Sequence, residues 1–576
     1  MQNHEFERGV LLPTLRMGVI SSVNANIAKI NLRNAGAPSG TYFETGRYGL
    51  GEIGEFVLIE GQQNLILGRI VEIRLPEKDR KTVNQDYVGE HRLDAIGNIQ
   101  LLGTVSMMDD LSVTAGVDTY PRLGDRVYAA PEKFVAQIPT LMEQKVEKRA
   151  EIRLELGFVG SSQESVVSIS PEKLFGRHCA ILGATGGGKS WTTARIIEEC
   201  LKFKSKLILI DPSGEYRGLS NGGITHCHLG NPVDRAIDSK ECGLPPHCFQ
   251  ESDFIALFEP AGKVQGPKFK AALRSLRLAK LVPSIAPDGY IKKINQSKAP
   301  VFAAEMKPEI SDKLDDPKQK FDVKHLPSQI EQECVWPDGY NDTSKWGKED
   351  GNFSHCLSLV TRINGILNSS VFSCVFNCAA PPITDKIDSF LSGSDSLLRI
   401  CLSGISYEYK AREIIANAIG RYLLSKARLG FFRKQPLIIF VDEAHNFLGR
   451  QIGSEDSMAR LDAFEYLAKE GRKFGLNVCM ATQRPRDITE GVLSQIGTLL
   501  VHRLTNDRDR EVVERACGEI DRSASAFLPN LKPGEAALIG VDFPIPLTIQ
   551  LKKPTQRPMS EGPNFQEYWK ASEQIV

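Results

Sequence analysis

The hydrophobic pattern of the chain begins with short β-rich runs that are separated by glycines. From Met17 to Leu75 these runs are MGVISS, NIAKINL, EFVLIEG and LILGRIVEIRL, and IQLLGTVSM and YPRLGDRVYAAP extend the pattern to about Pro131. Runs of this length and composition predict strands that are joined by turns.

These strands predict a small β-barrel over roughly residues 10–137, within an amino-terminal domain of residues 1–140. We expect turns at Gly97, Gly103 and Gly124. Small barrels of this kind often serve as assembly or partner modules, so we expect that role here.

After a charged stretch, LMEQKVEKRAEIRLELG, the pattern changes to apolar strands that are followed by helical runs. This alternation is expected of βαβ units around a parallel sheet. It resumes later with LLRICLSGIS, IIANAIGRYLLSKA and QPLIIFVDEAHNF. The pattern therefore predicts an α/β core with a parallel sheet, formed by residues 150–245 and 396–553.

A helical insertion is predicted between the two parts of this core, over residues 246–395. It contains the amphipathic runs FKAALRSLRLAKLV and CLSLVTRINGILNSSVF. A polar stretch near residues 306–355 is expected to be a mobile connection. The tail, residues 554–576, has too little apolar content to form a core, so we expect it to pack on another part of the protein.

Composition narrows the class of protein. Of 576 residues, 41% are hydrophobic and 25% are charged, which is typical of a globular chain with several domains. The 71 basic and 71 acidic residues give no net charge, so any contact with a nucleic acid has to be local. The 12 scattered cysteines suggest free thiols in a reducing compartment. No apolar run approaches the roughly 18 to 20 residues that cross a bilayer, so we expect a cytoplasmic protein.

The strongest local motif is ILGATGGGKSWTTARIIEE. Residues 183–190 match G-x-x-x-x-G-K-[ST] between a strand and a helix, as a phosphate loop requires. Glycines let the backbone wrap phosphate oxygens, Lys189 would reach the β and γ phosphates, and the Ser190 hydroxyl would bind Mg²⁺. This context favours ATP binding over a glycine-rich turn without a ligand. The predicted nucleotide-binding residues of this segment are Gly183, Ala184, Thr185, Gly186, Gly187, Gly188, Lys189, Ser190 and Trp191.

Two later apolar strands end in an acid, KLILID at Asp211 and PLIIFVD at Asp442. In the second, Asp442 can hold Mg²⁺ through water while the adjacent Glu443 acts as general base on the attacking water. Asp211 and Glu215 are then expected near the γ-phosphate as polar nucleotide-binding groups. A turn-capping role in D-P-S-G remains the alternative for Asp211.

The strand in LNVCMATQRP ends with Thr482 and Gln483. It therefore places a neutral donor at the carboxyl edge, where open α/β sheets bind ligands. Gln483 is predicted to sense the γ-phosphate or to orient water. A simple cap of the strand end is the alternative.

In this order, the motifs resemble those of the HerA family of hexameric DNA-translocating ATPases, bacterial type, which are relatives of FtsK and of conjugative coupling ATPases. The resemblance is carried by EFVLIEG, LILGRIVEI, RHCAILGATGGGKS, DPSGEY, DEAHNF, EGRKFGLNV, ATQRP, LVHRLTNDRD and LKPGEAALIG. These segments cover the barrel and the ATPase core. The helical insertion and the tail match by position only.

The resemblance implies that the α/β core is of the P-loop (RecA-like, ASCE) type. It also implies an ATP-driven double-stranded DNA translocase or helicase. It implies a homo-hexamer with nucleotide sites between neighbours and duplex DNA in a central channel. It also implies a separate effector, a nuclease or a NAD-consuming sirtuin-like protein, which docks on the amino-terminal barrel. The expected process is DNA-end processing or anti-phage defence.

A site between subunits calls for a cation supplied by the neighbour, because negative charge develops on the γ-phosphate. Arg472 in KEGRKFG matches the family's arginine-finger position, and Arg177 in GRHCAILG matches a second phosphate-side arginine. An ordinary helix-end arginine is the alternative for Arg472.

One basic segment could contact DNA. Between Lys263 and Lys280 there are six Lys or Arg and no acid, and Lys268, Lys270, Arg274 and Arg277 have spacings that can share a helix face. A solvated face of the insertion and a phosphate-contacting surface both remain open, and we favour the first.

A group of histidines and cysteines between residues 226 and 248 resembles a metal cluster, but it lacks the spacing of paired ligand sets. We therefore predict no zinc site there, and buried thiols at Cys374 and Cys378. The group comprises His226, Cys227, His228, Cys242, His247 and Cys248.

Two other functions remain open on the sequence alone. An ATP-gated scaffold ring could assemble and activate the effector with little translocation, since an intact catalytic set suits both uses. A conjugative-type coupling ATPase is the second, and the lack of a membrane segment disfavours it.

Overall fold

The computed structural model describes residues 11–32, 41–43, 46–48, 51–75, 95–107, 111–143, 152–160, 163–220, 222–316, 319–448, 450–452, 459–517, 522–560, 562 and 564–569. The chain forms two compact units, and each is described by itself. Unit 1 comprises Met1–Lys202, Gln483–Arg486 and Ile496–Thr555, and unit 2 comprises Phe203–Thr482, Asp487–Gln495 and Gln556–Val576.

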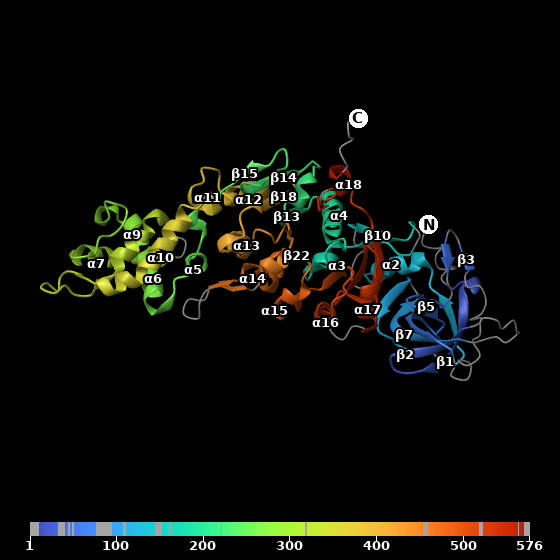
Figure 1. Ribbon diagram of the computed structural model, residues 1–576. Helices are drawn as coiled ribbons and strands as arrows, with labels where there is room; N and C mark the ends of the chain where they lie inside the picture. Colours follow the sequence, from blue (N-terminus) through green and yellow to red (C-terminus); the bar gives the residue numbers. More distant parts are fainter. Residues whose placement is uncertain are drawn as a thin grey trace, which may run out of the picture. The chain divides into compact units, whose positions relative to one another are not determined.

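Unit 1 begins with a closed antiparallel barrel of six strands, which confirms the predicted small β-barrel (Figure 1). The strands follow the order β2-β1-β9-β5-β6-β7, and β7 pairs with β2 to close the barrel. Buried side chains such as Leu15, Ile30 and Ile99 fill its interior. The six strands are β1 (Arg16–Val23), β2 (Ile27–Leu32), β5 (Phe56–Ile59), β6 (Leu65–Arg74), β7 (Ala95–Ser106) and β9 (Arg126–Ala129).

Two of the three expected turns are wrong, because Gly97 and Gly103 lie inside β7. Both are glycines because neighbouring strands approach too closely for a side chain. A Cβ atom at Gly97 would lie 2.8 Å from Ile30 Cγ2, and one at Gly103 would lie 2.6 Å from the Thr114 carbonyl oxygen. Gly124 is in a turn with φ of 89°, as predicted. Glycine in a strand therefore marks close backbone contact here rather than a turn.

The rest of unit 1 is a mixed sheet, with order β11-β10-β25-β24-β23-β12. Only β12 and β23 are parallel, and the other neighbours are antiparallel. The bounds are β10 (Leu154–Phe158), β11 (Val166–Ile169), β12 (Cys179–Leu182), β23 (Thr498–Val501), β24 (Glu535–Gly540) and β25 (Phe543–Leu551). Helix α4 (Lys189–Leu201) follows β12, as the strand and helix pattern predicts.

Unit 1 also contains a helix that the pattern does not predict, α2 (Glu132–Glu143). It contacts β11 and also β8 (Ser112–Ala115), the strand that extends one end of β7. Phe134 and Ile138 on α2 are completely buried. The helix therefore joins the barrel to the mixed sheet within this unit.

Unit 2 contains six parallel strands in the order β22-β19-β13-β18-β14-β15, which confirms the α/β class with a parallel-sheet core. Their central residues are almost all buried and apolar, as in sheets covered on both faces. The strands are β13 (Lys206–Asp211), β14 (Ile224–Gly230), β15 (Lys240–Glu241), β18 (Leu397–Gly404), β19 (Leu437–Val441) and β22 (Leu476–Thr482). Helices α13 (Ala411–Arg428) and α14 (Ala463–Glu470) pack against each other beside this sheet.

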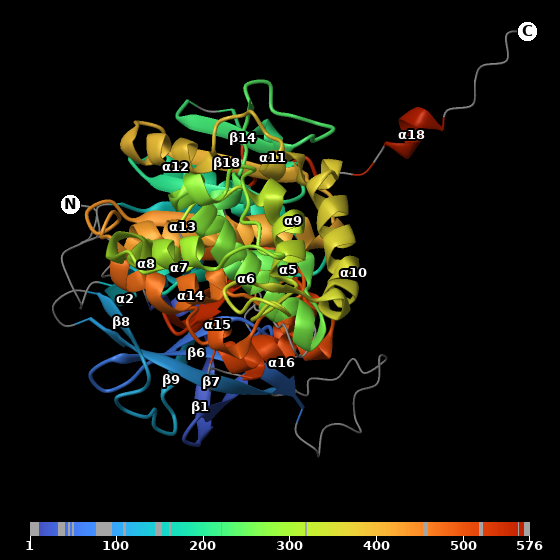
Figure 2. The same cartoon turned by 90° about the vertical axis from the view of Figure 1, so that its left-hand side faces the viewer.

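The predicted insertion is mainly helical, and its longest helices, α6 (Gly262–Leu281) and α10 (Asp350–Leu367), cover the two amphipathic runs. Both contact α9 (Leu326–Glu333), and Figure 2 shows the three gathered together. The expected mobile connection at 306–355 is wrong. Its described residues form α8 (Pro308–Leu314), α9 and a two-stranded hairpin, because Leu314, Leu326 and Ile330 are buried. The predicted domain boundaries themselves stay a prediction.

The described part of the tail supports the expectation that it packs on another segment. In unit 2, the Met559 N–H donates to the Glu215 carbonyl, and the Ser220 N–H donates to Gln556 Oε1. Among the described residues, no single helix is long and apolar enough to cross a bilayer, although α10 and the bent segment Ser370–Phe376 together pass that test of length and composition.

One buried lysine donates hydrogen bonds to the end of the helix that precedes β18. Lys206 is 6% exposed and its ammonium donates to the carbonyls of Phe390, Gly393 and Asp395 at 2.9, 2.8 and 2.6 Å. These carbonyls belong to the end of α12 (Ile383–Ser392) and the turn after it. The lysine thus satisfies acceptors that the helix end leaves without a donor.

Substituting this lysine tests the contact. Lys206→Met should lower the free energy of unfolding by about 2–4 kcal/mol, because three buried carbonyls lose their donor. The exposed Lys280→Met should change it by less than about 0.5 kcal/mol. Urea unfolding of the two variants measures the difference, and equal values would contradict the assignment.

Candidate functional site

The phosphate loop in unit 1 leaves β12 at Gly183 and ends at the first turn of α4. Gly186 and Gly188 have φ of 76° and 107°, values that side-chain-bearing residues rarely adopt. Lys189 is 8% exposed, and its ammonium donates to the Ala184 carbonyl at 3.3 Å. The backbone therefore has the glycine-dependent curvature that a phosphate cradle needs.

The structure brings Gln483 to this loop. The Thr185 hydroxyl donates to Gln483 Oε1 at 2.6 Å. A side chain at the end of β22 thus contacts the segment expected to surround the phosphates. Its sensing role stays a prediction, because a side chain that only caps the strand end could make the same contact.

A histidine that the sequence reasoning did not assign lies under the loop. His502 follows β23, is completely buried, and contacts Gly183 and Gly188 of the loop. Burial is the main cause that lowers its pKa to about 4, and the Lys189 charge acts in the same direction. The available signal was a histidine directly after an apolar strand in LVHRL.

The acidic residues lie at the carboxyl ends of the parallel strands of unit 2. Asp442 follows β19 and is 4% exposed, and Glu443 has φ of 46°, in the left-handed region. Burial first, and then the charges of Asp211, Glu443 and Glu215, raise the pKa of Asp442 well above its ordinary value. A strained residue beside crowded carboxylates is typical of a functional site.

Asp211 has the turn-capping role that the sequence left open. Its carboxylate accepts from the backbone N–H of Gly214 at 2.7 Å and of Tyr216 at 3.2 Å. It also pairs with Arg399 at 2.8 Å, and both side chains are at most 1% exposed. A direct contact of Asp211 with nucleotide stays a prediction. Arg399 was missed, although a charge inside the apolar run LLRICL was its signal.

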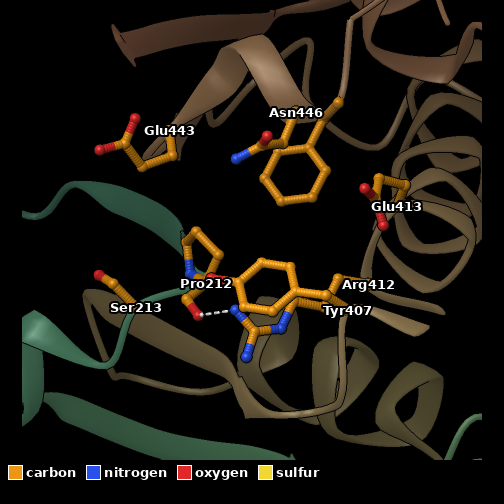
Figure 3. Close-up of a pocket in the computed structure, with 8 residues that line it drawn as sticks. Pro212, Ser213, Tyr407, Arg412, Glu413, Glu443 and Asn446 are labelled. Carbon is orange, nitrogen blue, oxygen red and sulfur yellow. Dashed lines mark hydrogen bonds between the residues drawn. The ribbon is translucent and has the colours of Figure 1, made fainter. Parts of the chain in front are cut away.

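A pocket opens beside Glu443, and Figure 3 shows the side chains around it. Arg412 donates to the carbonyls of Pro212 and Ser403, both at 3.0 Å, and stacks on the Tyr407 ring at 3.9 Å. It therefore ties the loop after β13 to the end of β18. The pocket is lined by Pro212, Ser213, Tyr407, Arg412, Glu413, Glu443, Asn446 and Phe447.

The two predicted arginines lie at the opposite strand ends. Arg177 precedes β12, whereas the phosphate loop of unit 1 follows that strand. The Arg177 guanidinium lies 3.6 Å from the Asp542 carboxylate. Arg472 precedes β22, whereas Glu443 follows the parallel neighbour β19. Arg472 is exposed, and the structure gives it no acidic partner among the residues it describes. A seven-residue strand such as β22 is about 20 Å long, so Arg472 does not reach Glu443 of its own unit.

The basic segment is engaged within unit 2. On α6, Lys268 donates to the Glu333 carbonyl at 2.7 Å, and Lys270 lies 3.4 Å from Glu251. Arg274 pairs with Glu305 and Asp315. These contacts favour a face of the insertion over a phosphate-contacting surface.

The histidine and cysteine group has local partners instead of a shared ligand. His226 contacts the Leu219 carbonyl and His228 the Ser239 hydroxyl, both at 2.8 Å. Within the described ranges, no group of three or more His, Cys, Asp or Glu side chains is placed to hold a metal ion. The thiols of Cys374 and Cys378 are free, and Cys374 is buried.

Several known proteins are similar to this chain. Residues 154–332 match the family described as "Helicase HerA, central domain". A probable helicase of Methanocaldococcus jannaschii is 24% identical over 407 residues, which are 69% of this chain and 70% of the relative. The DNA double-strand break repair helicase HerA of Sulfolobus acidocaldarius is 23% identical over 432 residues, 73% of each chain. The solved plasmid coupling protein TrwB with a non-hydrolysable ATP analogue has a TM-score of 0.43 and 16% identity, covering 73% of this chain and 94% of its own.

The parallel sheet, the phosphate loop and the acidic strand end define the class, a P-loop ATPase. More particularly, residues 154–332 match the model of the HerA central domain, so the resemblance to the HerA family is confirmed over these residues.

Acidification should destabilise the protein through His502. Above about pH 6.5 the imidazole is neutral in both the folded and the unfolded protein. Between about pH 6.5 and 4 only the unfolded protein binds the proton, so the free energy of unfolding falls as pH falls. The difference between the two pKa values corresponds to about 3 kcal/mol at most. Urea unfolding at about pH 7 and about pH 5 should show a smaller decrease in His502→Gln than in the wild type. An equal decrease in both would contradict the assignment.

Proposed function

We propose that the protein is an ATP-driven translocase of double-stranded DNA that works as a homo-hexameric ring. The observation that carries this proposal is the separation of the catalytic groups within each unit. The phosphate loop and Glu443 lie at the carboxyl ends of their strands, whereas Arg177 and Arg472 lie at the amino ends. Such arginines suit the nucleotide of a neighbouring copy, and heterologous contacts of this kind generate rings.

The chemistry assigned to the chain is hydrolysis of the γ-phosphate. Lys189 would bind the β and γ phosphates, Glu443 would take the proton of the attacking water, and Gln483 would orient that water. Arg472 from the neighbour, with Arg177, would stabilise the charge that develops on the γ-phosphate. Trp191, Asp211 and Glu215 complete the proposed nucleotide-binding set.

The acidic end of β19 offers a ligand for a divalent cation. Burial first, and then the charges of Asp211, Glu443 and Glu215, raise the pKa of Asp442. A cation relieves such repulsion. Asp442 and the Ser190 hydroxyl would hold Mg²⁺, which supplies charge neutralisation at the phosphates.

Duplex DNA is the proposed track, because the relatives include helicases named for DNA double-strand break repair. We further propose that a nuclease or sirtuin-like effector docks on the amino-terminal barrel. Exposed apolar residues in barrel loops, Ile53, Tyr120 and Leu123, support a protein partner there. DNA-end processing or anti-phage defence is the proposed context, and a cytoplasmic location stays a prediction.

Linear duplex DNA should stimulate ATP turnover, and the stimulation should fade as salt rises, because phosphate contacts release counterions. Lys189→Ala is the blank for contaminating ATPases. Glu443→Gln should lower turnover at least about 100-fold while nucleotide binding persists, since it removes the proposed base. Turnover that is indifferent to DNA at every salt concentration would contradict the proposed translocase and favour the ATP-gated scaffold.

Mixing two inactive variants tests supply of the arginine by a neighbour. Lys189→Ala and Arg472→Ala should each lose most ATP turnover. An equal, exchanged mixture should regain about a quarter of wild-type turnover, because about one interface in four pairs an intact phosphate loop with an intact arginine. No recovery in a mixture whose subunits exchange would place Arg472 in its own subunit's site or outside the reaction. The Arg472→Lys variant serves as a control, since it keeps the charge but not the planar fork.

A further inference from the structure

His502 fills the space directly beneath the phosphate loop. A Cβ atom at Gly183 would lie 2.6 Å from His502 Cβ, and one at Gly187 would lie 3.4 Å from the same atom. A Cβ atom at Gly188 would lie 3.3 Å from the ring carbon Cε1. Three glycines of the loop therefore lie against the buried side chain of His502, Gly183 and Gly187 beside its Cβ atom and Gly188 beside its ring, all within unit 1.

The hydrogen bonds of the ring determine its protonated nitrogen. Nδ1 lies 2.8 Å from the Glu535 carbonyl, which can only accept, so Nδ1 carries the proton. Nε2 of the neutral ring then accepts from the Thr192 hydroxyl at 2.8 Å. The same hydroxyl can also donate to the Gly188 carbonyl at 3.1 Å, but that carbonyl already accepts the Thr192 backbone N–H at 2.9 Å. The single hydroxyl proton is therefore assigned to the shorter contact with Nε2.

These contacts join three elements around the loop. Thr192 is in the first turn of α4, His502 follows β23, and Glu535 begins β24. The ring is thus held by a hydrogen bond at each of its two nitrogens. A protonated ring would lose its acceptor at Nε2 and would add a second positive charge near Lys189.

We propose that His502 is a positioning residue that holds the phosphate loop in its nucleotide-accepting shape before the nucleotide binds. Glycines lose more conformational freedom on ordering than other residues, so a loop of three consecutive glycines is costly to order. A preformed loop avoids this cost at the moment of binding. The inference rests on the proposed nucleotide site, but it requires neither the ring nor movement of DNA.

The test removes one hydroxyl and keeps the shape of the side chain. Thr192→Val should weaken the binding of fluorescent ADP and ATP analogues about tenfold, because Nε2 loses its donor and the ring is free to tilt. The KM for ATP should rise by the same factor while kcat stays near the wild-type value, since the loss affects ground state and transition state alike. Thr192→Ser, which keeps the hydroxyl, should restore the affinity.

The chain offers a matched control in the adjacent residue. Thr193 is also 1% exposed, and its hydroxyl has no hydrogen-bond partner in the described part of the chain. Thr193→Val should therefore leave nucleotide affinity unchanged. Equal losses in the two valine variants would attribute the effect to helix packing and would overturn the inference.

A double variant links the effect to the histidine. His502→Gln and Thr192→Val should each weaken binding, and the double variant should be no weaker than the poorer single variant, because both remove the same contact. Wild-type nucleotide affinity in Thr192→Val, or additive losses of affinity in the double variant, would overturn this inference and leave the proposed function unaffected. Failure of the wild-type protein to bind ADP or ATP would overturn the proposed function as well. Thermal unfolding of each variant shows whether it is folded.

Discussion

The direction of the parallel strands is the constraint on which the proposed site depends. In unit 2, six strands run the same way, so the loops that follow them share one edge and the loops that precede them share the other. Asp211 ends a strand, Asp442 and Glu443 follow one, and Arg472 precedes one. The sheet thus separates these acids from Arg472. The proposed supply of this arginine by a neighbouring copy rests on that separation.

Two buried aspartates of unit 2 differ in whether a cation of the same unit neutralises them. Arg399 neutralises Asp211 in the interior, where an unpaired carboxylate would be strongly destabilising. Asp442 directly follows β19, the parallel neighbour of β13. It has no such internal cation among the described ion pairs, and its pKa is raised. One aspartate is therefore satisfied by the fold, and the other retains the electrostatic repulsion that a bound cation would relieve.

Much of this arrangement could be predicted from sequence, because it depends on local patterns. The phosphate loop lies between its predicted strand and helix, and the strands before Asp211, Asp442 and Gln483 end within one residue of their expected positions. What could not be predicted depends on partners distant in the chain. Gly97 is set by contact with Ile30 in another strand, and the role of His502 depends on Thr192 and Glu535. Helix α2 and the ordered segments of residues 306–355 were missed for the same reason, since their burial comes from tertiary contacts.

ATP hydrolysis by this protein is proposed to move it along duplex DNA. The most direct measurement is release of a labelled third strand from a DNA triplex placed on a linear duplex, followed over time with and without ATP. We expect release with ATP by the wild-type protein and none by Glu443→Gln, although both bind the duplex. ATP turnover by the wild-type protein without any release would contradict translocation and leave an ATPase that works on a stationary assembly.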